Sequence, residues 1–341
     1  MPYGYPSGSA LREMLVDQST FDELIVGNLI SRNDVGGFCE RFLYSGMNSI
    51  DAFLSRIGSE QITPGGKTYE SVGKLGIACA LRQNTTMGGL FLDPALRSRT
   101  DLHLDFSDDW YRYLWNQMCA GITQGNLEDF AKNEISIVTF NYDLSLEHYL
   151  FTCLKNAYSV DAVKANELLR AISISHVYGS LSHGEVGYMS PRTYGAGGKA
   201  LILQDAASIH IIDEQRSLEK KTHYEIDYLF AKASNICFLG FGFDSVNLAR
   251  LGISQALRKR MEFELDQTGV IPNVYGTFVG FEQAEIERVA HGLFDDMRQP
   301  FTHHPHSSQL MLHYHERAVT QLTAKLEHKS LRLLRAVGVL Q

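Results

Sequence analysis

The sequence predicts an α/β fold built on a parallel, doubly wound sheet. Four β-favouring stretches begin near residues 135, 172, 235 and 274, and helical patterns separate them. Parallel strands need long crossover connections, usually helices, so this alternation is typical of a parallel sheet. We therefore expect a Rossmann-like domain over residues 1–298, with a helical subdomain inserted at about 20–125. A helical tail at 299–341 is expected to serve docking or oligomerisation.

Composition excludes several classes of protein. The chain has 341 residues, 44% of them hydrophobic, which is enough for one large or two ordinary domains. A formal net charge of −8 argues against a broad nucleic-acid surface. The five cysteines form no CxxC pair, which argues against a zinc ribbon and fits a reducing cytoplasm. Without a signal peptide or a long apolar run, we expect a cytoplasmic protein that does not enter membranes.

The first third of the chain is mostly helical in pattern. A helix with Leu11 and Leu15 on its apolar face follows Ser7 or Ser9 as the N-cap. Ser49 is the expected cap of a later helix. Turn-forming residues predict a loop over 84–100. Further helices are expected near residues 21–31, 36–45, 50–57, 68–83 and 107–121.

The stretch ISIVTFNYDLSLEHYL, residues 135–150, predicts a buried strand that runs into a helix. Ligands of open α/β sheets bind beyond the carboxyl ends of the strands, where Asn141 and Asp143 would lie. Both residue types also shape turns and cap helices. Taken alone, the stretch favours the turn and the cap.

After helices at about 144–158 and 161–170, a second strand at 171–181 ends in His176 and a Tyr-Gly-Ser turn. A single histidine in such a place is more often structural than catalytic. Residues 182–200 are rich in glycine and predict a flexible flap. Two short β-like pieces, ALIL and SIHII, are expected between residues 200 and 213, followed by a helix to 233.

A third strand, from 235, meets the turn Gly240-Phe241-Gly242 and then a helix that begins at Asp244. Glycines there allow the backbone to approach either a ligand or a crossing helix. A fourth strand, 274–279, leads to a helix at 282–298. The tail holds five histidines within 303–315, without a cysteine or carboxylate at ligand spacing, so no metal site is expected. A long helix is predicted over 308–337.

Three of these features, in this order and spacing, resemble the sirtuin-like family, and in particular its bacterial, zinc-less NAD-cleaving members. They are TFNYD at 139–143, the strand ending in His176 with Gly-Ser three residues on, and FLGFGFDSVN at 238–247. Phe140 replaces the glutamine of the family's T-Q-N-x-D motif. Softer matches at 49–58 and 109–115 extend the resemblance over residues 1 to about 290.

The resemblance implies roles for particular residues. Asn141 would lie beside the nicotinamide ribose, and His176 would be the general base. The expected NAD-binding residues are Gly4, Pro6, Phe140, Asp143, Gly240, Phe241, Gly242 and Asp244. No cysteine lies between 177 and 234, where protein-deacylating sirtuins carry four zinc ligands, so neither zinc nor deacylation is expected. Gly4-Tyr5-Pro6 matches the piece that follows the family's first strand and GAGxS loop, and that strand and loop are missing from this sequence.

The expected function is therefore that of an NAD+ glycohydrolase, an NAD+ nucleosidase that releases nicotinamide and ADP-ribose, with NAD as substrate. The resemblance also implies a bacterial anti-phage effector that depletes NAD, as a homo-oligomer or with a sensor or ATPase partner. The alternative is a non-catalytic subunit of a defence complex that binds NAD or ADP-ribose, or serves as a scaffold.

Overall fold

The computed structural model describes the chain over the following residues: 5–87, 109–181, 198–211, 219–243, 245–264, 272–278, 280–294, 316, 319 and 330–337. The chain divides into two compact units. The first comprises 1–106 and 119–218, and the second comprises 107–118 and 219–341. The predicted boundary between a domain at 1–298 and a tail at 299–341 stays a prediction.

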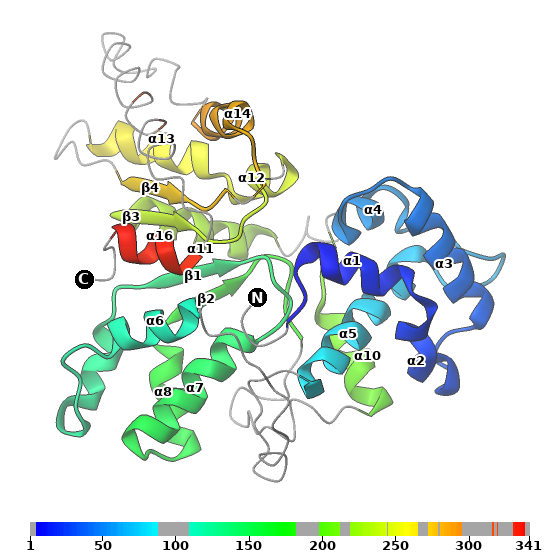
Figure 1. Cartoon of the computed structure of the whole chain (residues 1–341), viewed down its shortest axis with the longest axis horizontal. Coiled ribbons are helices and arrows are strands. Elements are labelled where there is room, and N and C mark those ends of the chain that lie inside the picture. The colour runs from blue at the N-terminus through cyan, green and yellow to red at the C-terminus, as the bar shows by residue number, and fades with distance from the viewer. Residues whose placement is uncertain are drawn as a thin grey trace. The chain divides into compact units, whose positions relative to one another are not determined.

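The first unit begins with helices that pack around a long central one, α5 (Figure 1). Two predicted caps are confirmed: Ser7 Oγ accepts a hydrogen bond from the Ala10 amide at 3.2 Å, and Ser49 Oγ from the Ala52 amide at 3.1 Å. α5 continues to Met87, so the loop predicted from residue 84 begins too early. The helices are α1 (Gly8–Val16), η2 (Gln18–Phe21), α2 (Asp22–Val26), α3 (Arg32–Tyr44), α4 (Ile50–Ile57) and α5 (Tyr69–Met87).

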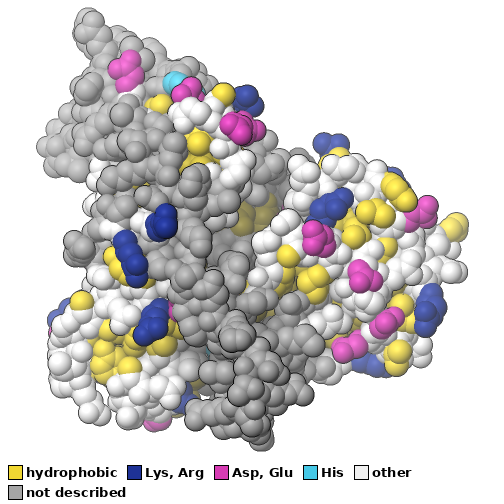
Figure 2. All heavy atoms as spheres, viewed as in Figure 1, with side chains coloured by type: hydrophobic (Ala, Val, Ile, Leu, Met, Phe, Trp, Pro, Cys, Tyr) yellow, Lys and Arg dark blue, Asp and Glu magenta, His cyan; other side chains and the backbone are white. Residues whose placement is uncertain are grey.

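A cluster of aromatic rings forms the core of these helices. Phe38, which is fully buried, lies at its centre, and its ring centroid is 5.8 Å from those of both Phe21 and Phe53. Phe42 and Tyr69 complete the cluster. On the face shown in Figure 2, basic and acidic side chains are interspersed over these helices rather than gathered by sign.

The first unit also contains a two-stranded parallel sheet. β1 (Ser136–Thr139) pairs with β2 (Ser173–His176), so that Thr139 lies opposite His176. The connection between the strands consists of α7 (Ser145–Tyr158) and α8 (Ala162–Arg170), and η5 (Gln124–Lys132) precedes β1. β1 is half-buried rather than buried as predicted.

The prediction of two β-like pieces between residues 200 and 213 was wrong. ALIL lies in the helix α10 (Lys199–Ser208), and the described part of SIHII, residues 208–211, contributes an isolated bridge from Ile209 to Gly179 rather than a strand. The buried residues Ile202, Asp205, Ala206 and Ile209 recur at helical spacing. The apolar run ALIL concealed this period because it is too short to distinguish strand from helix.

The second unit contains the other parallel pair, β3 (Asn235–Phe238) and β4 (Asn273–Gly276). Its C-terminal helix α16 packs against α6 and β4, with Leu333 and Leu334 buried. The predicted helix over 308–337 otherwise falls mostly outside the described residues. The remaining helices are α6 (Trp110–Met118), α11 (Glu219–Lys232), α12 (Ser245–Leu251), α13 (Ile253–Glu264), α14 (Gln283–Leu293) and α16 (Ser330–Val337).

The fold is mixed α/β, as predicted, and the four strands predicted from near residues 135, 172, 235 and 274 are present. The strands pair two by two, and among the described residues no hydrogen-bonded ladder joins the pairs into one doubly wound sheet. Hydrophobic period identifies a strand but does not encode its neighbours, since pairing depends on residues distant in sequence. No helix in the described part of the chain is long and apolar enough to span a membrane.

Candidate functional site

The carboxyl ends of β1 and β2 bring the predicted catalytic residues together. The Val177 amide donates to the Thr139 carbonyl at 2.8 Å, and the Leu181 amide donates to the Tyr142 carbonyl at 2.8 Å. These backbone bonds hold the segment after β1 against the segment after β2. Asn141 and His176, 35 residues apart, consequently lie in contact.

Both ring nitrogens of His176 have protein partners. Nδ1 lies 2.7 Å from the backbone carbonyl oxygen of Asn141. A carbonyl can only accept, so Nδ1 carries a hydrogen and donates it. Nε2 lies 2.6 Å from Oε1 of Glu147, in the first turn of α7. The His176 and Glu147 side chains are 10% and 12% exposed, so their contact is largely shielded from water.

The surroundings of His176 favour its protonated form. Burial, the largest single effect, lowers the pKa of the imidazole, while the hydrogen bond and the negative charge of Glu147 raise it. The Asn141 carbonyl and the Asp143 carboxylate act in the same direction as Glu147. The net pKa of His176 is therefore raised above its ordinary value, and the pair retains its proton to a higher pH than a free imidazole would.

Asp143 is buried and shapes the entry to α7. Its Oδ1 accepts a hydrogen bond from the Ser145 amide at 3.0 Å. Burial raises the pKa of Asp143, the Ser145 hydrogen bonds lower it by less, and the nearby charge of Glu147 adds to the rise. The turn-shaping role inferred from the sequence is thus confirmed for Asp143.

Unlike the buried Asp143, Asn141 has an exposed side chain. Its backbone amide donates to Thr139 Oγ1 at 3.1 Å and its carbonyl accepts from His176. Within the described residues the side-chain amide forms no hydrogen bond. It is therefore available to a ligand at this edge of the sheet.

Aromatic rings frame the segment after β1. The half-buried Phe140 makes an edge-to-face contact with Tyr178, whose ring centroid is 5.5 Å away. Tyr142 stacks on the same Tyr178, and its hydroxyl donates to the carboxylate of Asp51 in α4. The helical part of the unit thus contacts the site through Tyr142.

The predicted glycine turn, Gly240-Phe241-Gly242, lies in the second unit. Gly240 has a left-handed backbone (φ 61°), and its amide donates to Thr277 Oγ1 at 2.7 Å. A Cβ added at Gly240 or Gly242 would meet no atom within 4 Å. Open space beside both glycines does not support close packing against a crossing helix. Phe241 and Phe243 belong to an aromatic cluster with Phe238, and Phe243 stacks on Phe278.

Two predicted NAD-binding residues, Gly4 and Asp244, lie outside the described residues, as do the histidines of 303–315 and all but the last three residues of the flap predicted at 182–200. The end of that predicted flap, Lys199 and Ala200, lies in the helix α10 instead. Pro6 is half-buried and precedes the Ser7 cap of α1. Among the residues that the structure describes, no group of three histidine, cysteine or acidic side chains is placed to hold a metal ion.

Glu147 is the functional candidate that the sequence analysis missed. An acidic residue in the first turn of a helix is commonplace, because it interacts favourably with the helix dipole. A weak signal existed: Glu147 follows Asp143 by four residues, the spacing that brings two side chains to the same side of a helix start. Its contact with His176 depends on strand pairing, which this spacing does not reveal.

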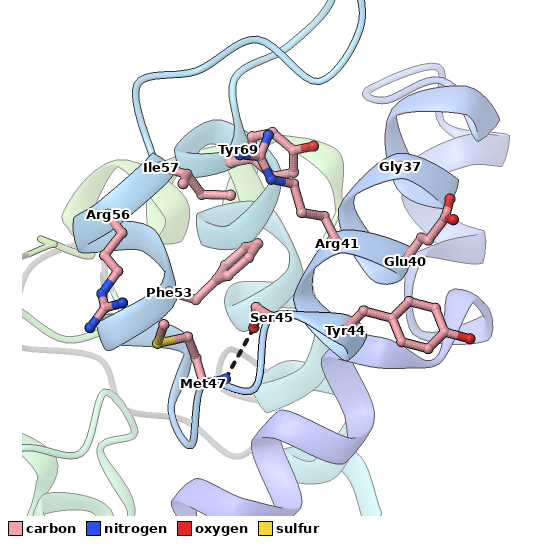
Figure 3. Close-up of a pocket in the computed structure, with 10 residues that line it drawn as sticks. All are labelled: Gly37, Glu40, Arg41, Tyr44, Ser45, Met47, Phe53, Arg56, Ile57 and Tyr69. Atoms are coloured by element: carbon pink, nitrogen blue, oxygen red, sulfur yellow. Dashed lines mark hydrogen bonds between the residues drawn. The ribbon is translucent and has the colours of Figure 1, made fainter.

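A surface cavity of about 580 Å³ lies among α3, α4 and α5 (Figure 3). Arg41 crosses it, with its guanidinium carbon 5.0 Å from the centroid of the Tyr69 ring and Nη1 2.8 Å from Glu60 Oε2. Phe53 and Arg56 also line the cavity, which contains none of the predicted site residues.

Comparisons with family models, with curated proteins and with solved structures found no match. The function is therefore argued from the geometry at the ends of β1 and β2 and from the motifs of the sequence.

Proposed function

We propose that this chain is an NAD+ glycohydrolase, an NAD+ nucleosidase that releases nicotinamide and ADP-ribose. The observation that carries the proposal is the register of β1 and β2, with Thr139 opposite His176. Because of this register Asn141 and His176, the two residues that the motif resemblance implies as catalytic, are in direct contact. Their contact lies at the carboxyl edge of parallel strands, where α/β sheets bind ligands.

The site does not have to assist departure of the leaving group. Nicotinamide departs as a neutral molecule from a cationic ring, so no general acid is needed. The site must orient the substrate, stabilise an oxocarbenium-like ribose and supply a base for water. The exposed amide of Asn141 can both donate to and accept from the ribose and the water. His176, which donates to the backbone carbonyl of Asn141, is the base.

The finer architecture belongs to the same proposal. In a Rossmann-like doubly wound sheet, the turn Gly240-Phe241-Gly242 would support the adenosine half of NAD. The open space beside Gly240 and Gly242 supports this role, since a ligand could approach their backbone. The resemblance further suggests a cytoplasmic anti-phage effector that acts as a homo-oligomer or with a sensor or ATPase partner.

One observation favours a second candidate, a subunit that binds NAD or ADP-ribose without cleaving it. Both ring nitrogens of His176 are already engaged, by Asn141 and by Glu147. A base needs a lone pair that can reach the water. A site in which the pair with Glu147 never releases its proton would bind without turnover.

Asn141→Ala separates these candidates. Incubation with NAD+ followed by chromatography is expected to show nicotinamide release by the unaltered protein and none by the variant. Because the Asn141 side chain is exposed, its removal should change the free energy of unfolding by no more than about 0.5 kcal/mol. The matched control is Asn156→Ala, an exposed asparagine near the end of α7, which should keep full activity.

Full activity in Asn141→Ala would overturn the assignment. NAD+ binding by calorimetry without nicotinamide release would favour the binding subunit, and neither binding nor release would exclude both. His176→Ala is a less clear test, because it removes two hydrogen bonds and takes away the imidazolium that offsets the charges of Glu147 and the buried Asp143. Lost activity in that variant could come from lost stability.

A further inference from the structure

Glu147 contacts the ring nitrogen that a general base would use. Nδ1 of His176 is committed as a donor to the Asn141 carbonyl, so Nε2 is the basic nitrogen. Oε1 of Glu147 lies 2.6 Å from Nε2. A water molecule at this site would therefore have two adjacent proton acceptors, the imidazole of His176 and the carboxylate of Glu147.

We propose that Glu147 both holds the His176 ring and accepts the proton of water together with it, so that the two side chains act as one base. The inference rests on the proposed function, because it assigns a part in that reaction. Both ring nitrogens of His176 are engaged, but the carboxylate of Glu147 has a second oxygen that can accept a proton.

The charges around the pair define its two states. The groups that face His176 are Glu147 from α7, Asp143 from the β1–α7 loop and the carbonyl of Asn141. In the resting state one proton lies between Nε2 and Oε1, and the pair is neutral overall. Loss of that proton leaves a neutral imidazole beside a carboxylate, and this form, with a net charge of −1, is the base.

In the proposed step the O–H bond of water breaks and its proton passes to the carboxylate of Glu147, to be shared with Nε2. The water oxygen bonds to C1′ of the ribose. The bond from C1′ to the nicotinamide nitrogen breaks, and its electron pair stays on the neutral nicotinamide. Release of the shared proton to solvent restores the base.

This arrangement predicts where activity falls on the acid side. The base form exists only above the raised pKa of His176, so the acid limb of kcat/KM should lie above the ordinary imidazole value of 6.5. Glu147→Gln keeps a hydrogen-bonding side chain of the same size but removes the charge. Because the amide cannot accept the proton, kcat should fall, and the acid limb of the remaining activity should move to lower pH.

Glu147→Ala removes the hold on the ring as well as the charge. We expect it to lower kcat by on the order of 10²-fold with little change in KM, because the base is misplaced while the rest of the site is unaltered. The comparison of the two variants separates the charge of Glu147 from its positioning role.

The experiment has one readout that needs no activity. The ring C–H signals of His176 are followed by NMR against pH in the full chain, with Glu167→Gln as the control. Glu167 is an exposed acid whose carboxylate lies 3.2 Å from Lys164, on α8. His176 should titrate above 6.5 in the unaltered protein and in the control, and at lower pH in Glu147→Gln. The pH profile of nicotinamide release is then measured for the same three proteins.

An unchanged His176 titration in Glu147→Gln overturns the inference, whatever the activity. A shifted titration with an unmoved acid limb overturns the role in catalysis. A shifted titration in a protein that never releases nicotinamide refutes the proposed function, and the pair is then structural. If Glu147→Gln does not fold, Glu147→Asp applies the same test, because it withdraws the carboxylate from Nε2 by one methylene.

Discussion

Arg82→Met is expected to destabilise the first unit by about 3 kcal/mol, because it removes the arginine that pairs with a buried carboxylate. Arg82, in α5, donates through Nε to the carboxylate of Asp205, in α10. The Asp205 side chain is 0% exposed and that of Arg82 is 10% exposed. The ion pair therefore joins two packed helices away from water.

The magnitude follows from burial. Removing one member of a buried ion pair typically costs about 3–5 kcal/mol. The lower end applies here, because Arg82 Nη1 is buried and has no hydrogen-bond partner among the residues that the structure describes, so its removal returns about 1 kcal/mol or more. The double variant Arg82→Met with Asp205→Leu removes both charges and should lie within about 2 kcal/mol of the unaltered protein.

Urea denaturation followed by far-ultraviolet circular dichroism measures each free energy of unfolding. Arg41→Met is the control, because its partner Glu60 is 49% exposed and the Arg41 side chain is 46% exposed. That exposed pair should contribute no more than about 1 kcal/mol. The reasoning is refuted if Arg82→Met costs no more than this control, or if the double variant is as unstable as the single one.

Two further predictions concern the interior. Asp143→Asn should raise the melting temperature at neutral pH and leave it unchanged in acid. Burial raises the folded-state pKa of Asp143, so its ionisation costs stability once the pH rises above the pKa of the unfolded state. The asparagine oxygen avoids this cost and still accepts from the Ser145 amide. Equal melting temperatures of the two proteins across the pH series would contradict this prediction. Phe38→Ala should cost about 3–5 kcal/mol in urea denaturation, because Phe38 is fully buried among aromatic rings. Tyr44→Ala, at a side chain that is 80% exposed, should stay within about 0.5 kcal/mol of the unaltered protein, and similar losses in both variants would argue against the aromatic core.

Local signals in the sequence located much of the secondary structure. Ser7 and Ser49 cap helices as predicted, since a capping side chain bonds an amide only three residues away. The predicted strand starts agree with β1 to β4, because β-branched residues mark a strand within its own few positions. The prediction of a strand at ALIL was wrong, because four apolar residues are too few to show whether their spacing is that of a strand or of a helix.

The candidate site was predicted in part. Asn141 and His176 were chosen from motif order, and the structure brings them into contact. Gly240 and Gly242 lie in the other unit, and their part in the site remains a prediction. Glu147 was not foreseen, although it makes the closest contact with the histidine.

The sequence by itself determined the class of the fold, the strands and caps, and the residue types at the ends of β1 and β2. Only the tertiary structure decided that the described strands pair two by two, and that the backbone carbonyl of Asn141 contacts a His176 already joined to Glu147. The reason is physical. Capping and strand preference act over a few residues, whereas the register of two strands and the meeting of side chains 29 residues apart depend on how whole elements pack.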